Sequence, residues 1–178
     1  LSRITEPSDP VYDQAGAAIW RPHVGFFYYT NRYLRHHMTA DDVARVIGEI
    51  ESTGCTVYLH GSRFETLPEA LRHELLSRFV PAYDDLWVWG RRLHPSPDGF
   101  VEVDIPRDGG YFLGRRDGGV VPRIEQSGAW HDAPIHLGRG PHRLRVEAFS
   151  GEVFLLWLPA DGQPFVPGHP APSRFSRV

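Results

Sequence analysis

The segment Pro95-Ser96-Pro97 divides the sequence into two parts whose residue patterns differ. Before this segment, apolar runs alternate with two stretches whose apolar residues recur at helical spacing. After it, short runs of alternating apolar and polar residues are separated by turns rich in Gly and Pro. The patterns predict an α/β unit over residues 1–95, an antiparallel β-sandwich over 96–165 and an extended tail rich in Pro and Ser over 166–178.

The first part is expected to alternate three strands with two helices. The apolar runs that predict its strands are 24–30, 56–59 and 85–89. A βαβαβ order of this kind predicts a small parallel sheet with right-handed crossovers.

Local sequence signals predict where the two helices begin and end. Thr39 and Asp42 have the spacing of a capping box at the start of the first helix, and Gly54 provides its stop. Thr66 is expected to cap the second helix, and Pro81 is expected to end it.

The second part contains six runs that predict the strands of an antiparallel β-sandwich. They are 100–105, 111–113, 120–125, 134–137, 142–149 and 153–158.

A polar loop follows each strand of the predicted parallel sheet, and each loop contains an arginine. In such sheets ligands bind beyond the carboxyl ends of the strands, so the three loops are expected to share one edge. Guanidinium groups there would bind a phosphate or a carboxylate. The alternative is that Arg, the only cation in a chain with 19 basic residues and no Lys, simply occupies exposed loops. The candidate ligand-binding residues of this edge are Asn31, Arg32, His60, Ser62, Arg63 and Arg91.

Trp130 and Asp132 form a second candidate site, in a loop expected between two strands. An exposed indole beside a carboxylate suits a sugar, because the ring stacks on the pyranose and the acid accepts from hydroxyls. The alternative is that Trp130 folds over the end of the sandwich as part of its core.

Composition and motifs exclude several classes of function. A net charge of −3 gives no electrostatic basis for binding nucleic acid. The single Cys55 excludes an internal disulfide and is predicted to be a buried, inert thiol. No dinucleotide-binding or phosphate-binding glycine motif occurs, so we predict no cofactor. The one arrangement that suggests a metal-dependent hydrolase is His131, Asp132 and His136.

Several stretches resemble a known family. Residues 9–16 and 21–34 resemble the soluble extracytoplasmic region that follows the transmembrane helices in bacterial membrane glycosyltransferases. These enzymes are relatives of the dolichyl-phosphate-mannose–protein mannosyltransferases and of the aminoarabinose transferases. Residues 79–90 are similar to the strand that closes their α/β unit. Residues 137–144 and 155–159 are similar to a β-sandwich appended in some of them, itself like certain carbohydrate-binding modules.

The resemblance implies a periplasmic, membrane-tethered domain of an enzyme that moves a sugar from a polyprenyl-phosphate carrier to an acceptor. The catalytic acid of that family lies between early membrane helices that this chain lacks, so we expect no catalysis by this chain alone. The implied partners are a glycan or lipid-linked sugar and the transmembrane half of the parent protein. A first residue of Leu1 fits a piece of a longer protein. The alternatives are a free-standing carbohydrate-binding protein that uses Trp130 and Asp132, and the metal-dependent hydrolase.

Overall fold

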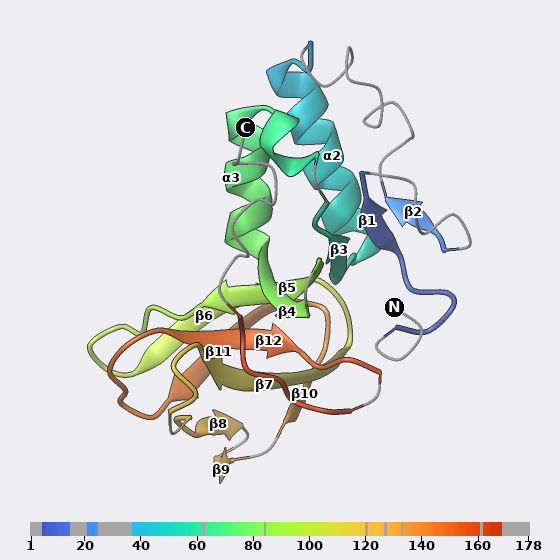
Figure 1. The fold of residues 1–178 in the computed structure, drawn as a ribbon. Helices are drawn as coiled ribbons and strands as arrows, with labels where there is room; N and C mark the ends of the chain where they lie inside the picture. The colour runs from blue at the N-terminus through green and yellow to red at the C-terminus, as the bar shows by residue number, and fades with distance from the viewer. Residues whose placement is uncertain are drawn as a thin grey trace.

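A computed structural model gives the structure of the chain. It describes residues 5–14, 21–24, 37–61, 63–83, 85–119, 121–126, 128–132, 134–160 and 162–168. Most of the regular structure in these ranges is β-sheet, and two α-helices accompany it (Figure 1). The strands form a curled mixed sheet and a separate antiparallel sheet.

The mixed sheet contains eight strands of the described chain. Its order is β10 (Ile135–Leu137), β7 (Gly109–Arg115), β12 (Val153–Trp157), β5 (Leu86–Arg92), β3 (Val57–Leu59), β1 (Val11–Asp13) and β2 (His23–Val24), with β4 (Phe79–Tyr83) paired to β5. The pairs β1–β2 and β1–β3 are parallel, and the other pairs are antiparallel. Strands from both sides of Pro95-Ser96-Pro97 therefore belong to one sheet.

The separate sheet consists of four antiparallel strands of the described chain. Their order is β6 (Phe100–Ile105), β11 (Gly140–Val146), β8 (Ile124–Gln126) and β9 (Ala129–His131). Alternate residues of β6 are buried, as expected for a strand with one face on the core. The buried side chains of both sheets and of the helices form one apolar cluster.

Helix α2 (Ala40–Thr53) confirms its predicted ends. The Thr39 hydroxyl accepts from the Asp42 N–H at 3.2 Å, and the Asp42 carboxylate accepts from the Thr39 N–H at 2.9 Å, which completes the capping box. Gly54 follows the helix with a φ of 63°, and a Cβ atom there would lie 2.8 Å from the main-chain oxygen of Pro106. The strand β3 follows at once and falls within the predicted run 56–59.

Helix α3 (Glu69–Arg78) differs from the prediction at both ends. Thr66 does not cap it, because Thr66 closes a short 3₁₀ turn, η2 (Phe64–Thr66), in which its hydroxyl donates to the Arg63 main-chain oxygen at 2.6 Å. Pro81 does not end the helix either, because it lies inside β4. Within the described residues β4 pairs only with β5, and an unpaired strand edge tolerates the missing N–H of proline.

The strand β4 also explains why the predicted all-parallel βαβαβ unit is wrong at its third strand. No sequence signal predicted β4, which follows α3 directly and pairs antiparallel with β5. The chain therefore reverses once more than expected, and β5 runs antiparallel to β3. Of the predicted first strand 24–30, only Val24 lies within the described residues, at the end of β2.

The described part of the C-terminal region packs on the mixed sheet without regular structure. The ring of Phe165 lies 5.2 Å from the ring of Phe112 and 5.7 Å from that of Tyr83. The Gly168 N–H donates to the Pro81 main-chain oxygen at 2.8 Å. This segment covers part of the sheet face that includes β4 and β7.

Candidate functional site

Two cavities lined by described residues share the side chains of Arg91 and Asp104. The first has a volume of about 380 Å³, and we call it the Arg78 cavity. Its polar and aromatic lining comprises Glu51, Arg78, Trp89, Arg91, Asp104 and Arg139. The second has a volume of about 680 Å³, and we call it the Arg92 cavity. Its polar lining includes His73, Ser77, Arg91, Arg92, His94, Glu102, Asp104, Arg116 and Glu152.

The elements around these cavities come from both parts of the chain. Arg78 is the last residue of α3, and Glu51 lies in the last turn of α2. Arg91 lies on β5, and Asp104 lies on the outward face of β6, whose alternate residues are buried. The site therefore forms where the C-terminal ends of two helices meet β5 and the separate sheet.

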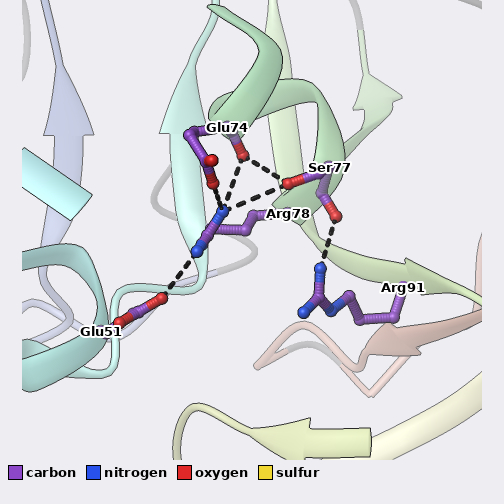
Figure 2. A network of polar contacts seen from close by, with 5 residues as sticks. All are labelled: Glu51, Glu74, Ser77, Arg78 and Arg91. Carbon is purple, nitrogen blue, oxygen red and sulfur yellow. Dashed lines mark hydrogen bonds and ion pairs between the residues drawn. The ribbon is translucent and has the colours of Figure 1, made fainter. Parts of the chain in front are cut away.

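Arg78 is fully engaged by neighbouring acidic side chains (Figure 2). Its Nη2 atom lies 2.7 Å from Glu51 Oε1, and its Nη1 atom forms an ion pair with Glu74. The pair with Glu74 joins positions one turn apart on α3, whereas the pair with Glu51 joins α3 to α2. Arg78 therefore holds the two helices together, and its charge is balanced.

Arg91 and Arg139 cap the C-terminal ends of the helices. Arg91 Nη1 donates to the main-chain oxygen of Ser77 in the last turn of α3, at 3.1 Å (Figure 2). Arg139 Nη2 donates to the main-chain oxygen of Glu51 in the last turn of α2, at 2.9 Å. Carbonyls in the last turn lack the partner of a helix interior, although that of Glu51 also accepts from the Gly54 N–H at 3.2 Å, and a positive charge is favourable there. These two contacts give both arginines a structural role.

Arg91 and Asp104 nevertheless retain capacity to bind a ligand. A guanidinium carries five N–H donors, and Arg91 forms no ion pair within the described residues. Burial lowers the pKa of the Arg91 guanidinium, and the nearby charge of Arg78 acts in the same direction. An arginine still keeps its proton at neutral pH. The Asp104 side chain likewise has no hydrogen-bond or ion-pair partner in the part of the chain that the structure describes.

The charges around the Arg78 cavity are balanced. The guanidinium groups of Arg78, Arg91 and Arg139 are matched by the carboxylates of Glu51, Glu74 and Asp104. The C-terminal ends of α2 and α3 add partial negative charge. This cavity therefore offers planar donors and acceptors together, beside the indole of Trp89, without a positive excess. Such a wall suits hydroxyl groups, which both donate and accept, better than a phosphate.

The structure does not bring the predicted arginine edge together. Because β5 is antiparallel to β3, Arg91 lies toward the amino end of β3, beside Cys55, and not beyond its carboxyl end. Arg63 lies at the opposite end, where its Nη1 atom donates to the Gln14 main-chain oxygen at 3.3 Å. The placement of Arg91 on a shared edge with Arg63 is therefore wrong. Asn31, Arg32 and Ser62 lie outside the described residues.

His60 lies at the same end of β3 as Arg63. Its imidazole stacks on the indole of Trp87, with ring centroids 4.4 Å apart and planes 5° apart. Burial lowers the pKa of His60, although the charge of Asp85 opposes that change. His60 is therefore packed on the aromatic core. It was predicted to bind a ligand together with Arg91, but the two residues lie at opposite ends of β3.

Trp130 lies on a short strand, β9, where its sequence surroundings predict a loop. Its side chain is 40% exposed, so it does not fold into the core. The guanidinium carbons of Arg123 and Arg145 lie 5.7 and 5.8 Å from its ring. Arg123 Nε also lies 3.9 Å from Asp132 Oδ1. Trp130 and Asp132 are thus close to a common arginine, and a sugar on the ring would compete with these cations.

Other sequence predictions concern Cys55 and the histidines. Cys55 is fully buried, and its thiol donates to the Val57 main-chain oxygen at 3.2 Å. This confirms the prediction that Cys55 is buried, and burial raises the pKa of its thiol to about 12, in the direction expected of an inert cysteine. His131, Asp132 and His136 were considered as metal ligands. Among the described residues, no group of three or more His, Cys, Asp or Glu side chains is arranged to hold a metal ion. None of the helices in the described ranges is long and apolar enough to cross a membrane.

Sequence reasoning missed three residues that build the Arg78 cavity, namely Arg78, Asp104 and Arg139. Alternation along 100–105 places Asp104 on the outer face, but nothing in the sequence shows which side chains that face meets. The contact between Arg139 and Glu51 joins residues 88 positions apart, and no local pattern signals it.

Comparisons of the chain with protein-family models, with curated proteins and with solved structures find no match.

Proposed function

We propose that this protein is a non-catalytic domain that binds a glycan in the Arg78 and Arg92 cavities. The observation that carries the proposal is the pair Arg91 and Asp104, which lies in the walls of both cavities and has unused donors and acceptors. A guanidinium and a carboxylate that line the same cavity can bind different hydroxyl groups of one saccharide. Trp89 lies at the edge of the Arg78 cavity but is only 4% exposed, so it supports the cavity from within the core.

The wider setting stays a prediction from the resemblance. In that setting the chain is an extracytoplasmic domain of a membrane glycosyltransferase, and the glycan is an acceptor or a product that the domain holds for the membrane half. In the same setting, the strands after Pro95-Ser96-Pro97, which are shared between both sheets, would correspond to the β-sandwich of carbohydrate-binding modules. The balanced charge of the Arg78 cavity favours a glycan over a bare phosphate group in that cavity.

A second candidate is a carbohydrate-binding protein that uses Trp130 and Asp132. The observation that favours it is the 40% exposure of the Trp130 side chain. The two guanidinium groups beside its ring argue for the Arg91–Asp104 site as the first choice.

The test is a titration of the protein with a panel of monosaccharides and disaccharides, followed by NMR. Asp104→Asn and Asp132→Asn make the same chemical change at the two candidate sites, and each is a matched control for the other. We expect Asp104→Asn to weaken binding about tenfold, the loss of one charged hydrogen bond, and Asp132→Asn to leave it unchanged. The reverse result would move the site to Trp130, and a panel without any ligand would contradict the proposed function.

A further inference from the structure

The Arg92 cavity has two walls of opposite charge. One wall carries the guanidinium groups of Arg91, Arg92 and Arg116, on β5 and just after β7. The other carries the carboxylates of Glu102 and Asp104, two residues apart on the outer face of β6. A ligand that fits such a cavity has an acidic end and an end rich in hydrogen-bond donors.

The wall that carries the three guanidinium groups has a positive excess, because Glu152 is the one carboxylate paired with it among the described residues. Arg92 Nη1 lies 3.0 Å from Glu152 Oε1, and Arg116 Nη1 lies 3.3 Å from Glu152 Oε2. One carboxylate thus serves two arginines, and the neighbouring Arg91 forms no ion pair within the described residues. Salt screens the Arg116 guanidinium only in part, because its side chain is 23% exposed, whereas the Arg92 side chain is 54% exposed and is screened more.

Arg116 is held in place with an unused donor. Its guanidinium carbon lies 5.1 Å from the ring centre of Phe154, a position in which the ring attracts the cation. Its Nε atom is buried and has no hydrogen-bond partner among the described residues. Because this atom is inaccessible, a ligand in the cavity would meet only the exposed part of the Arg116 side chain, which is 23% exposed.

We propose that the glycan carries an acidic group, a carboxylate or a phosphate monoester, which binds to Arg92 and Arg116. This inference rests on the proposed function and names the class of saccharide that the same site takes. The acidic group lies at Arg92 and Arg116, while the C-terminal end of α2 lines only the Arg78 cavity and the Ser77 carbonyl at the end of α3 is occupied by Arg91. The sugar hydroxyls donate to Glu102 and Asp104 on the opposite wall, and the planar fork of each arginine suits both kinds of acidic group.

Glu152 gives the proposal a distinctive consequence. An acidic ligand must compete with this carboxylate for the same two guanidinium groups. The variant Glu152→Gln keeps the shape of the side chain and removes its charge, so it strengthens the binding of acidic saccharides. Glu147→Gln is a matched control, because Glu147 pairs with Arg123, which lines neither cavity.

The test uses matched saccharides that differ only at C6, in NMR titrations of the whole chain. The probes are glucose with glucuronate and glucose-6-phosphate, and galactose with galacturonate and galactose-6-phosphate. We expect an acidic member to bind about tenfold more tightly than its neutral partner, as for one charge-assisted pair. Glu152→Gln is expected to tighten acidic binding severalfold without changing neutral binding, and Arg92→Gln is expected to remove most of the difference.

The outcomes separate the two proposals. Preference for the uronates or for the phosphorylated sugars identifies the source of the acidic group, and either preference supports the inference. Equal binding of neutral and acidic members, with Glu152→Gln and Glu147→Gln both unchanged, overturns the inference and leaves the proposed function standing. Failure of every saccharide to bind contradicts the proposed function and the inference together. Thermal melting of each variant shows that its fold is intact.

Discussion

Arg91 Nη1 donates a hydrogen bond to the main-chain oxygen of Ser77 at 3.1 Å, which joins β5 to the last turn of α3. The same guanidinium lines both cavities, so one side chain contributes to the fold and to the proposed site. The two contributions can be separated, because a hydrogen bond to a carbonyl needs one donor and a sugar uses several.

The variant Arg91→Lys is expected to separate stability from binding. A lysine keeps a positive charge near the Ser77 carbonyl but loses the planar fork. We expect the free energy of unfolding to fall by about 1 kcal/mol or less, and glycan binding to weaken about tenfold. Urea denaturation measures the first change, and NMR titration measures the second. Arg45→Lys, a change on α2 at a side chain that is 60% exposed, is the control and should alter neither. Unchanged glycan binding by Arg91→Lys would contradict the role of Arg91.

Gly54 is expected to tolerate no side chain. Its φ of 63° is strained for other residues, and an added Cβ would lie 2.8 Å from the Pro106 main-chain oxygen. Gly54→Ala should therefore lower the free energy of unfolding by roughly 1–3 kcal/mol. Gly48→Ala is the matched control, because Gly48 lies within α2 and a Cβ added there would point into open space among the described residues. Alanine at that position should stabilise the helix by up to about 1 kcal/mol. Equal effects of the two substitutions in urea denaturation would contradict this account of the helix end.

The ion pair between Arg107 and Asp9 is expected to contribute to stability. Arg107 Nη1 lies 2.8 Å from Asp9 Oδ1, and the Asp9 side chain is 5% exposed. Arg107→Gln would leave a buried carboxylate without its cation, so we expect a loss of roughly 2–4 kcal/mol in the free energy of unfolding. Arg145→Gln removes a more exposed pair with Glu125 and should cost less than about 1 kcal/mol. If chemical denaturation shows that both variants lose a similar free energy of unfolding, the buried pair stabilises the protein no more than the exposed pair does.

The reactivity of Cys55 is expected to report on unfolding. Burial raises the pKa of its thiol to about 12, so almost no thiolate exists in the folded protein at pH 8. The unfolded chain has an ordinary thiol pKa and forms more thiolate at the same pH. Iodoacetamide at pH 8 should therefore label the protein only in denaturant, as mass spectrometry would measure. Rapid labelling without denaturant would show that the thiol is accessible in the folded state.

Sequence signals predicted local structure best where a few neighbouring residues determine it. Thr39, Asp42 and Gly54 define the ends of α2 because a capping box and a left-handed glycine depend on adjacent main-chain groups. The alternation over 100–105 likewise predicted β6. Thr66 failed as a helix cap because its hydroxyl bonds to Arg63 in a 3₁₀ turn.

The candidate site could be predicted only in part, because it depends on how distant elements meet. Phe79–Tyr83 contains Pro81, and the sequence alone reads this proline as a helix stop, although it lies in β4. That one strand reverses β5 and separates Arg91 from Arg63. Arg91 was predicted to bind a ligand from its place after a strand, but its neighbours Asp104 and Arg139 come from the second part of the chain.

The most direct test of the proposed glycan site follows the tryptophan indole signals by NMR as a bound saccharide from the panel is added. The account predicts that the indole N–H signal of Trp89, which lines the Arg78 cavity, shifts in proportion to occupancy, while that of Trp130 stays in place. Trp89→Phe and Trp130→Phe assign the two signals. A shift at Trp130 with none at Trp89 would contradict the proposed site and locate the saccharide beside Trp130 on β9.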